Sequence, residues 1–211
     1  IYTLSLHDAL PIYQPVFDGV ITDRVADELI EAGVVFVPTL SLASLLIDGM
    51  QHRWCDDPQF TAGLPPALVR NMREFTTHYE QCPPDEPVPG FFVSLPKREW
   101  EAVPENQLRN VAKYIERGGT IALGTDSALG FSLHGTPVRE MELMVEAGLN
   151  TVEAIQAAGQ NAARVFSHKE NIGTITPGAL ADCLLVPAEI TASMTHLADI
   201  STVIQGGKVG W

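Results

Sequence analysis

Apolar positions in the first part of the chain follow helical spacing and then form an unbroken run. Residues 23–32 carry apolar side chains on one helical face, with Thr22 as a candidate N-cap and Gly33 where glycine commonly ends a helix. Residues 34–40 are apolar and rich in β-branched side chains without alternation, which is typical of a strand buried on both faces of a parallel sheet. This succession of helix and buried strand predicts an α/β protein.

The same succession returns later in the chain. A helix beginning at Pro104 ends at a pair of glycines, and residues 120–124 form a second short buried run. Helices are predicted over residues 137–147 and 151–158, and Asn150 begins the second of them with a capping-box pattern. The repeated pattern strengthens the α/β prediction.

Residues 41–103 are less regular, and we interpret them as an insert between the two helix–strand units. A helix is predicted over residues 65–81, followed by a proline-rich loop over residues 83–96. A connection of this length is unusual inside a compact domain. Two interpretations stay open: the segment packs its tryptophans and histidines as ordinary core and surface residues, or it forms a lid over a pocket.

The pattern changes to short β runs toward the C-terminus. These runs are predicted over residues 172–178, 183–186 and 202–209, the last with a Gly-Gly hairpin turn. We therefore divide the chain into an α/β part over residues 13–168 and a small β module over residues 169–211.

Composition and charge narrow the classes of partner. The 211 residues are 45% apolar and 18% charged, enough for a substantial core, and their formal net charge of -13 opposes binding to nucleic acid or an anionic membrane. No apolar run approaches the roughly 20 residues that span a bilayer. Cys55, Cys82 and Cys183 are scattered without zinc-binding spacing, which favours unpaired thiols in a reducing, cytoplasmic compartment.

Residues 1–12 resemble a translated sequencing adapter. One back-translation matches a common short-read adapter in frame over all its codons, and the segment has neither an initiator Met nor the basic region of a secretory signal. We therefore expect residues 1–12 to be an artefact outside the fold, with native sequence beginning near Tyr13 and an upstream part missing. His7 and Asp8 are set aside as candidate site residues for the same reason.

Asp126 is the leading candidate for chemistry. It closely follows the buried run 120–124, and the ligands of parallel α/β proteins lie at the carboxyl ends of the strands. A carboxylate there is costly to bury unless a cation offsets its desolvation, which favours a metal ligand or a general base. The alternative is that Asp126 caps the following turn.

Other polar residues near these strand ends have two interpretations each. His134, in the loop before the next helix, either binds substrate or donates a proton, or is simply solvated. Arg139 either faces an anionic group or is an ordinary exposed arginine, and Thr39 and Ser41 are either pocket-wall hydroxyls or turn formers. The sequence signatures of serine hydrolases, dinucleotide-binding folds, P-loop proteins and HExxH metalloproteases are absent.

Several stretches in the second half of the chain, taken in order, resemble the motifs of a known protein family. They are Gly124-Thr125-Asp126-Ser127 and residues 134–149, 151–155, 161–165, 173–182 and 203–209. In this order they closely resemble the C-terminal half of metal-dependent amidohydrolases, nearest the imidazolonepropionase-like branch that includes Xaa-Pro dipeptidases. The resemblance implies a (β/α)8 TIM-type barrel with one or two divalent metals, usually zinc, beside a small β-sandwich. It also implies that Asp126 binds metal and takes a proton from the attacking water, and that His134 contacts the substrate.

Other ligands of this family have no counterpart here. The His-x-His after the first strand, the Lys or carboxylate of the fourth, and the histidines of the fifth and sixth are absent. The resemblance therefore implies that the chain holds strands 7 and 8 with their flanking helices and part of the β-sandwich. Asp126 alone cannot hold a catalytic zinc, which normally needs three protein ligands.

We therefore expect a C-terminal fragment of a hydrolase that cleaves C–N bonds in an amide, a cyclic amide or a dipeptide by metal-activated water. The parent protein would act on a small-molecule substrate, and whether it forms a homo-oligomer stays open. The fragment alone would bind no metal tightly and would be inactive. One alternative is a complete small α/β binding protein without catalysis. A phosphatase using Asp126 as nucleophile would need a second carboxylate close by, which residues 127–128 do not offer.

Overall fold

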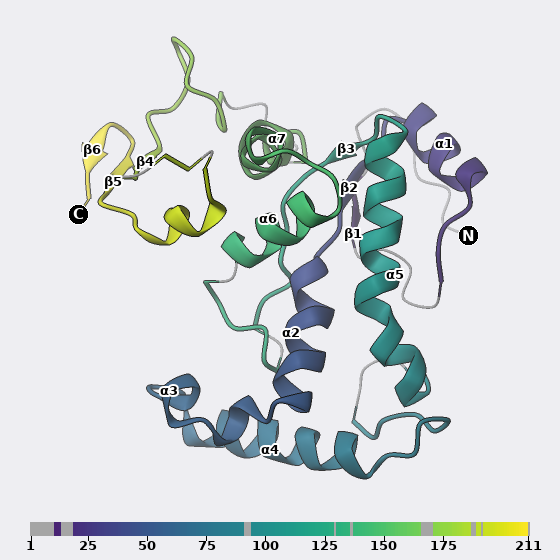
Figure 1. Cartoon of the computed structure of the whole chain (residues 1–211). Helices are drawn as coiled ribbons and strands as arrows, with labels where there is room; N and C mark the ends of the chain where they lie inside the picture. Colours follow the sequence, from purple (N-terminus) through teal and green to yellow (C-terminus); the bar gives the residue numbers. More distant parts are fainter. Residues whose placement is uncertain are drawn as a thin grey trace.

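The computed structural model contains two small sheets with helices around them (Figure 1). It describes residues 11–13, 19–90, 94–128, 130–135, 137–165, 171–186, 189–190 and 192–210. The parallel sheet lies among α5, α6 and α7, and the antiparallel sheet lies on the far side of α6 and α7 (Figure 1). The predicted boundary between residues 168 and 169 lies outside the described residues.

The first sheet is parallel and places β2 (Val35–Val37) between β1 (Pro11–Tyr13) and β3 (Thr120–Ile121). All three residues of β2 are buried, and beyond β3 the Ala122 N–H donates to the Phe36 carbonyl at 2.9 Å. The prediction of buried parallel strands at residues 34–40 and 120–124 is therefore confirmed, although each regular strand is shorter than its apolar run.

Strand β1 corrects the expectation that residues 1–12 lie outside the fold. Pro11 and Ile12 pair with Val35 and Phe36 of β2. The physical reason is that strand pairing uses backbone groups, so an extended segment can satisfy the edge of β2 whatever the origin of its sequence. The adapter origin of the segment stays a prediction, and residues 1–10 lie outside the described residues.

Helix α1 (Asp23–Glu31) begins and ends as its sequence predicts. The Thr22 hydroxyl oxygen accepts a hydrogen bond from the Val25 N–H at 3.3 Å, and Gly33 follows with φ of 70°. A positive φ is accessible to glycine without steric cost, which is why the chain can turn there into β2.

Helix α2 (Leu40–Gln51) is the main element that the sequence pattern missed. It begins two residues after β2 and buries most of its surface, including Leu42, Ile47 and Met50. A helix that is apolar almost all round lacks the one-sided periodicity used for prediction. The predicted irregular segment therefore starts as a core helix in contact with α4, α5 and α6.

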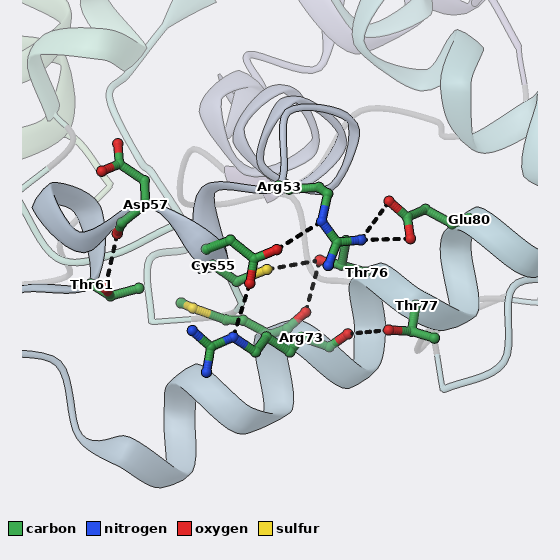
Figure 2. Close-up of polar contacts among 10 residues, drawn as sticks. Arg53, Cys55, Asp57, Thr61, Arg73, Thr76, Thr77 and Glu80 are labelled. Atoms are coloured by element: carbon green, nitrogen blue, oxygen red, sulfur yellow. Dashed lines mark hydrogen bonds and ion pairs between the residues drawn. The ribbon is translucent and has the colours of Figure 1, made fainter.

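The remainder of the predicted insert is also helical. A short 3₁₀ turn, η1 (Trp54–Asp56), and α3 (Pro58–Thr61) lead into α4 (Pro66–Gln81), which crosses the lower end of α2 (Figure 1). The α4 helix is confirmed within one residue. Figure 2 shows Arg53 reaching from the end of α2 to Glu80 of α4, at 2.6 Å.

Helix α5 (Lys97–Glu116) begins earlier than its predicted start at Pro104. Proline lacks an N–H and normally marks a helix boundary. Trp100 and Val103, which precede it, are both buried against the core that includes Leu42 and Met72. This packing favours the helical turns before the proline, and it supports the interpretation of the insert as ordinary core, leaving a lid untested.

Helices α6 (Pro137–Glu146) and α7 (Thr151–Gln156) match their predictions, and the π-helical turn η2 (Ala157–Asn161) extends α7. The capping box is present: the Asn150 Oδ1 accepts from the Glu153 N–H at 3.0 Å, and a Glu153 carboxylate oxygen accepts from the Asn150 N–H at 2.8 Å. Local sequence alone therefore determines where this helix begins.

The C-terminal sheet is antiparallel, with β5 (Thr202–Gln205) between β4 (Cys183–Leu185) and β6 (Lys208–Val209), and the 3₁₀ turn η3 (Met194–Ala198) precedes β5. Gly206 and Gly207 form the predicted hairpin turn with φ of 56° and 75°. The β run predicted at residues 172–178 is wrong, because this segment forms bends and turns. None of the helices in the described part of the chain combines the length and apolar character needed to cross a membrane.

Candidate functional site

The carboxyl ends of β2 and β3 meet at one edge of the parallel sheet. An ideal Cβ built on Gly124, beyond β3, would lie 2.4 Å from Val37 Cγ1 and 3.7 Å from Thr39 Cγ2. A side chain at position 124 would therefore push the two strand ends apart. Glycine allows the β2–α2 and β3–α6 connections to lie against each other.

Asp126 lies at this edge as predicted, and it is exposed. Its backbone has φ of 46°, and Ala128 has φ of 81°. Non-glycine residues in this left-handed region cost of order 1–3 kcal/mol and cluster at functional sites. Because Asp126 is exposed, its carboxylate does not carry the desolvation cost of a buried charge, and what distinguishes it is its place at the strand ends.

Two hydroxyls stand beside Asp126. Thr125 Oγ1 and Ser127 Oγ are 2.7 Å apart, which joins the residues on either side of Asp126. The Ala128 N–H also donates to the Ser132 carbonyl at 2.7 Å. These contacts hold the turn in one shape while its carboxylate remains accessible to solvent.

His134 lies further along the same connection, and Arg139 lies in the first turn of α6. His134 is exposed and precedes Gly135, whose φ is 98°. Arg139 forms an ion pair with Glu142 of α6, 3.3 Å between Nη1 and Oε2, which accords with an ordinary helical arginine. Substrate contact by His134 stays a prediction.

A divalent metal is the group that the sequence resemblance implies, and the described residues do not form a complete site for one. No group of three or more His, Cys, Asp or Glu side chains suited to metal binding occurs in the part of the chain that the structure describes. A catalytic zinc normally takes three protein ligands. Among the described residues, Asp126 offers one oxygen ligand, which is too few to hold a catalytic zinc.

Thr39 is the residue with which β2 passes into α2. It takes the N-cap position with φ of 49°, an unusual conformation for a β-branched residue, and its side chain does not cap the helix. Its buried Oγ1 has no hydrogen-bond partner among the described residues. Thr39 is therefore a turn former, and a pocket-wall role for its hydroxyl stays a prediction.

Glu140 of α6 caps α2 in place of Thr39. Its side chain is fully buried; Oε1 accepts from the Leu40 N–H at 2.8 Å, and Oε2 accepts from the Ser41 N–H at 2.6 Å. The first N–H groups of a helix have no partner within the helix, and its N-terminus favours negative charge. Burial raises the pKa of Glu140 to about 7, while hydrogen bonds from Ser41 and Leu40 oppose this rise.

Glu140 was not among the residues predicted from the sequence, although its position carries a signal. Glu140, Leu143, Met144 and Ala147 follow the i, i+3, i+4, i+7 spacing of one helical face, and all four are buried. An acidic residue on such a stripe needs a buried partner. The partner lies about a hundred residues away in the chain, in a helix that the pattern did not predict.

Helices that follow parallel strands, with polar residues at the carboxyl ends of those strands, define the class of α/β proteins that bind ligands at this edge. Within that class, the chain belongs to the amidohydrolase family, whose sequence model matches residues 16–210. The family assignment made from the ordered motifs is thereby confirmed. No curated protein matches the chain in sequence.

Solved structures with a similar fold include dipeptidases and other hydrolases. A Xaa-Pro dipeptidase with bound methionine in its active site aligns with a TM-score of 0.64 and 24% identity, over 95% of this chain and 39% of that chain. A putative prolidase from Bifidobacterium longum aligns with a TM-score of 0.64 and 21% identity, over 98% of this chain and 43% of that chain. An ochratoxinase from A. niger aligns with a TM-score of 0.63 and 20% identity, over 94% of this chain and 36% of that chain. The chain thus spans less than half of each of these structures, and the similarity concerns the fold.

Proposed function

We propose that this chain is part of a metal-dependent amidohydrolase that cleaves a C–N bond in an amide, a cyclic amide or a dipeptide. The observation that carries the proposal is the position of Asp126, at the carboxyl edge of the parallel strands and inside the stretch that the family model matches. The similar solved structures named for dipeptidase and prolidase support a dipeptide as the first substrate to test.

We further propose that the parallel strands belong to a (β/α)8 barrel and the antiparallel sheet to a β-sandwich. In this arrangement residues 13–168 are the last part of the barrel, with β2 and β3 as strands 7 and 8, and residues 169–211 are part of the sandwich. The parallel order of the strands and the helix after each of them support it. The remaining metal ligands would then come from barrel strands outside this chain.

The role of Asp126 in this proposal is to move a proton. In the complete protein, Asp126 and ligands from outside this chain would hold the metal, whose chemistry would be to make a water molecule more acidic. Asp126 accepts the proton that the water releases, the water oxygen bonds to the carbonyl carbon, and the C–N bond breaks as the proton passes to the leaving nitrogen. An exposed carboxylate at the strand ends is accessible to both water and substrate.

The test uses the complete protein that contains this chain, loaded with zinc and assayed on Xaa-Pro dipeptides. Asp126→Asn removes the proton acceptor, and we expect kcat to fall by about 10²–10⁴-fold. Asp199→Asn, at an exposed position in the C-terminal module, is the matched control and should keep the wild-type kcat. Full activity of Asp126→Asn would contradict the assigned role, and binding of dipeptides without turnover by the wild type would favour a non-catalytic protein.

A further inference from the structure

The buried carboxylate of Glu140 joins the two connections that meet at the strand ends. Glu140 belongs to α6, the helix after the β3–α6 connection that carries Asp126 and His134. Its two carboxylate oxygens accept hydrogen bonds from the N–H groups of Leu40 and Ser41, the first residues after the β2–α2 connection. A single side chain therefore ties together segments that lie far apart in the sequence.

The two hydrogen bonds lie where they can control the shape of the site edge. Thr39, directly before Leu40, has a strained left-handed backbone and no capping bond of its own. A strained residue persists only where the surrounding structure over-determines it. On one side of Thr39, the bonds from Leu40 and Ser41 to Glu140 fix the start of α2. On the other side, the end of β2 packs closely on Gly124, where a Cβ would lie 2.4 Å from Val37 Cγ1.

We propose that Glu140 is a positioning residue of the active site, acting through the Leu40 and Ser41 amides to hold the Thr39 turn against the Gly124–Asp126 turn. The proposal deepens the proposed amidohydrolase function and rests on it. Glu140 is buried and touches no reacting group, so it affects the reaction only by fixing where Asp126 and the Thr39 hydroxyl lie.

The arrangement also explains why Thr39 keeps an unpartnered hydroxyl. An N-cap threonine ordinarily accepts a hydrogen bond from the first turn of its helix. Here Glu140 takes the N–H groups of Leu40 and Ser41, and Thr39 Oγ1 is left without a partner among the described residues. We call the two hydrogen bonds from Leu40 and Ser41 to Glu140 the clamp. The clamp fixes the Thr39 turn and leaves the Thr39 hydroxyl without a partner at the site edge.

Hydrogen exchange measures the clamp directly in the complete protein. Glu140→Gln keeps the volume of the side chain but can offer only one acceptor oxygen, and Glu140→Asp keeps both oxygens on a shorter side chain. At pH 8 we expect the Leu40 and Ser41 amides, and those of residues 124–128, to exchange at least about tenfold faster in Glu140→Gln. The amides of α1 should not change, and Glu146→Gln, at an exposed position on the same helix, should match the wild type.

Kinetics separate positioning from simple support of the fold. For dipeptide hydrolysis by the folded variants we expect Glu140→Gln to lower kcat about tenfold or more, with KM and zinc content unchanged, and Glu140→Asp to recover part of the loss. Wild-type kcat in folded Glu140→Gln would overturn the proposal, as would unchanged exchange at residues 40–41 and 124–128. If Glu140→Gln does not fold, the same measurements on Glu140→Asp decide.

The failure of the proposed function has a different signature. A wild-type protein that hydrolyses none of the dipeptides would refute that function, and the exchange data would then decide whether Glu140 fixes the site edge. Faster exchange confined to residues 40–41 and 124–128 would support the clamp, and unchanged exchange there would overturn it.

Discussion

Glu140 occupies a helix position that an apolar side chain would normally fill. It shares a buried stripe with Leu143 and Met144, and its carboxyl group meets the first N–H groups of α2. Burial raises its pKa to about 7, while the N–H groups of Ser41 and Leu40 and the charge of Arg139 act in the opposite direction. The Glu140 carboxyl group therefore changes its protonation state near neutral pH.

This pKa predicts a pH-dependent contribution to stability. The unfolded chain releases the proton near the ordinary pKa of 4.5, whereas the folded chain holds it up to about pH 7. Between these values the folded state binds more protons, so the free energy of unfolding falls as pH rises, by about 3 kcal/mol relative to Glu140→Gln. Urea unfolding of both proteins from pH 4.5 to 8 measures this change. If the free energy of unfolding of the wild type minus that of Glu140→Gln stays constant or increases as pH rises, the prediction is contradicted.

At the scale of elements, long-range polar contacts set how α1 is attached to α5. Asn110 of α5 is fully buried, and its Oδ1 accepts from the Ile21 N–H at 2.7 Å while its Nδ2 donates to the Gly19 carbonyl at 3.0 Å. Ion pairs of Arg117 with Asp23 and Asp27 add contacts at the surface. Exposed pairs of this kind contribute little to stability, so the buried amide is the stronger attachment.

Truncation of this amide should loosen the segment before α1. Asn110→Ala leaves the Ile21 N–H and the Gly19 carbonyl without their partner, and we expect a loss of about 2–3 kcal/mol in the free energy of unfolding. Asn106→Ala, on the same helix but only partly buried, should change it by less than about 0.5 kcal/mol. Chemical unfolding monitored by circular dichroism gives both values. Equal effects of the two substitutions would show that the amide has no special role.

At the scale of the whole molecule, the parallel sheet has three short strands within the described residues, and similar solved structures are much longer than this chain. The Xaa-Pro dipeptidase is covered over only 39% of its length. A closed barrel of this class needs eight strands and about 250 residues. The carboxyl edge of this sheet is therefore, in our proposal, one part of a larger ring of ligands.

The proposal predicts different metal binding by the chain and by the complete protein. After zinc loading and removal of free metal, we expect stoichiometric zinc in the complete protein and almost none in the 211-residue chain. We also expect dipeptide hydrolysis only by the complete protein. Elemental analysis and a hydrolysis assay on the same samples test both. Tightly bound zinc together with metal-dependent activity in the chain alone would contradict the prediction.

Local signals predicted the elements whose ends depend on neighbouring residues. Thr22, Asn150 and the Gly206–Gly207 turn form as expected, because caps and hairpin turns are decided by bonds within a few residues. Helix α2 was missed because burial on nearly all sides removes its periodicity, and the start of α5 was misplaced because Pro104 is a local signal that packing at Trp100 outweighs.

The sequence by itself determined the α/β class and the family, since repeated periodicity and ordered motifs are properties of the chain. The role of Asp126 stays a prediction from the sequence. Only the tertiary structure identified Glu140, its hydrogen bonds to the start of α2 and the close approach of Val37 to Gly124. The physical reason is that a buried carboxylate is tolerated only beside donors that satisfy it, and here the donors come from a distant helix. Folding brings these residues together, so no local pattern of the sequence could have shown their contact.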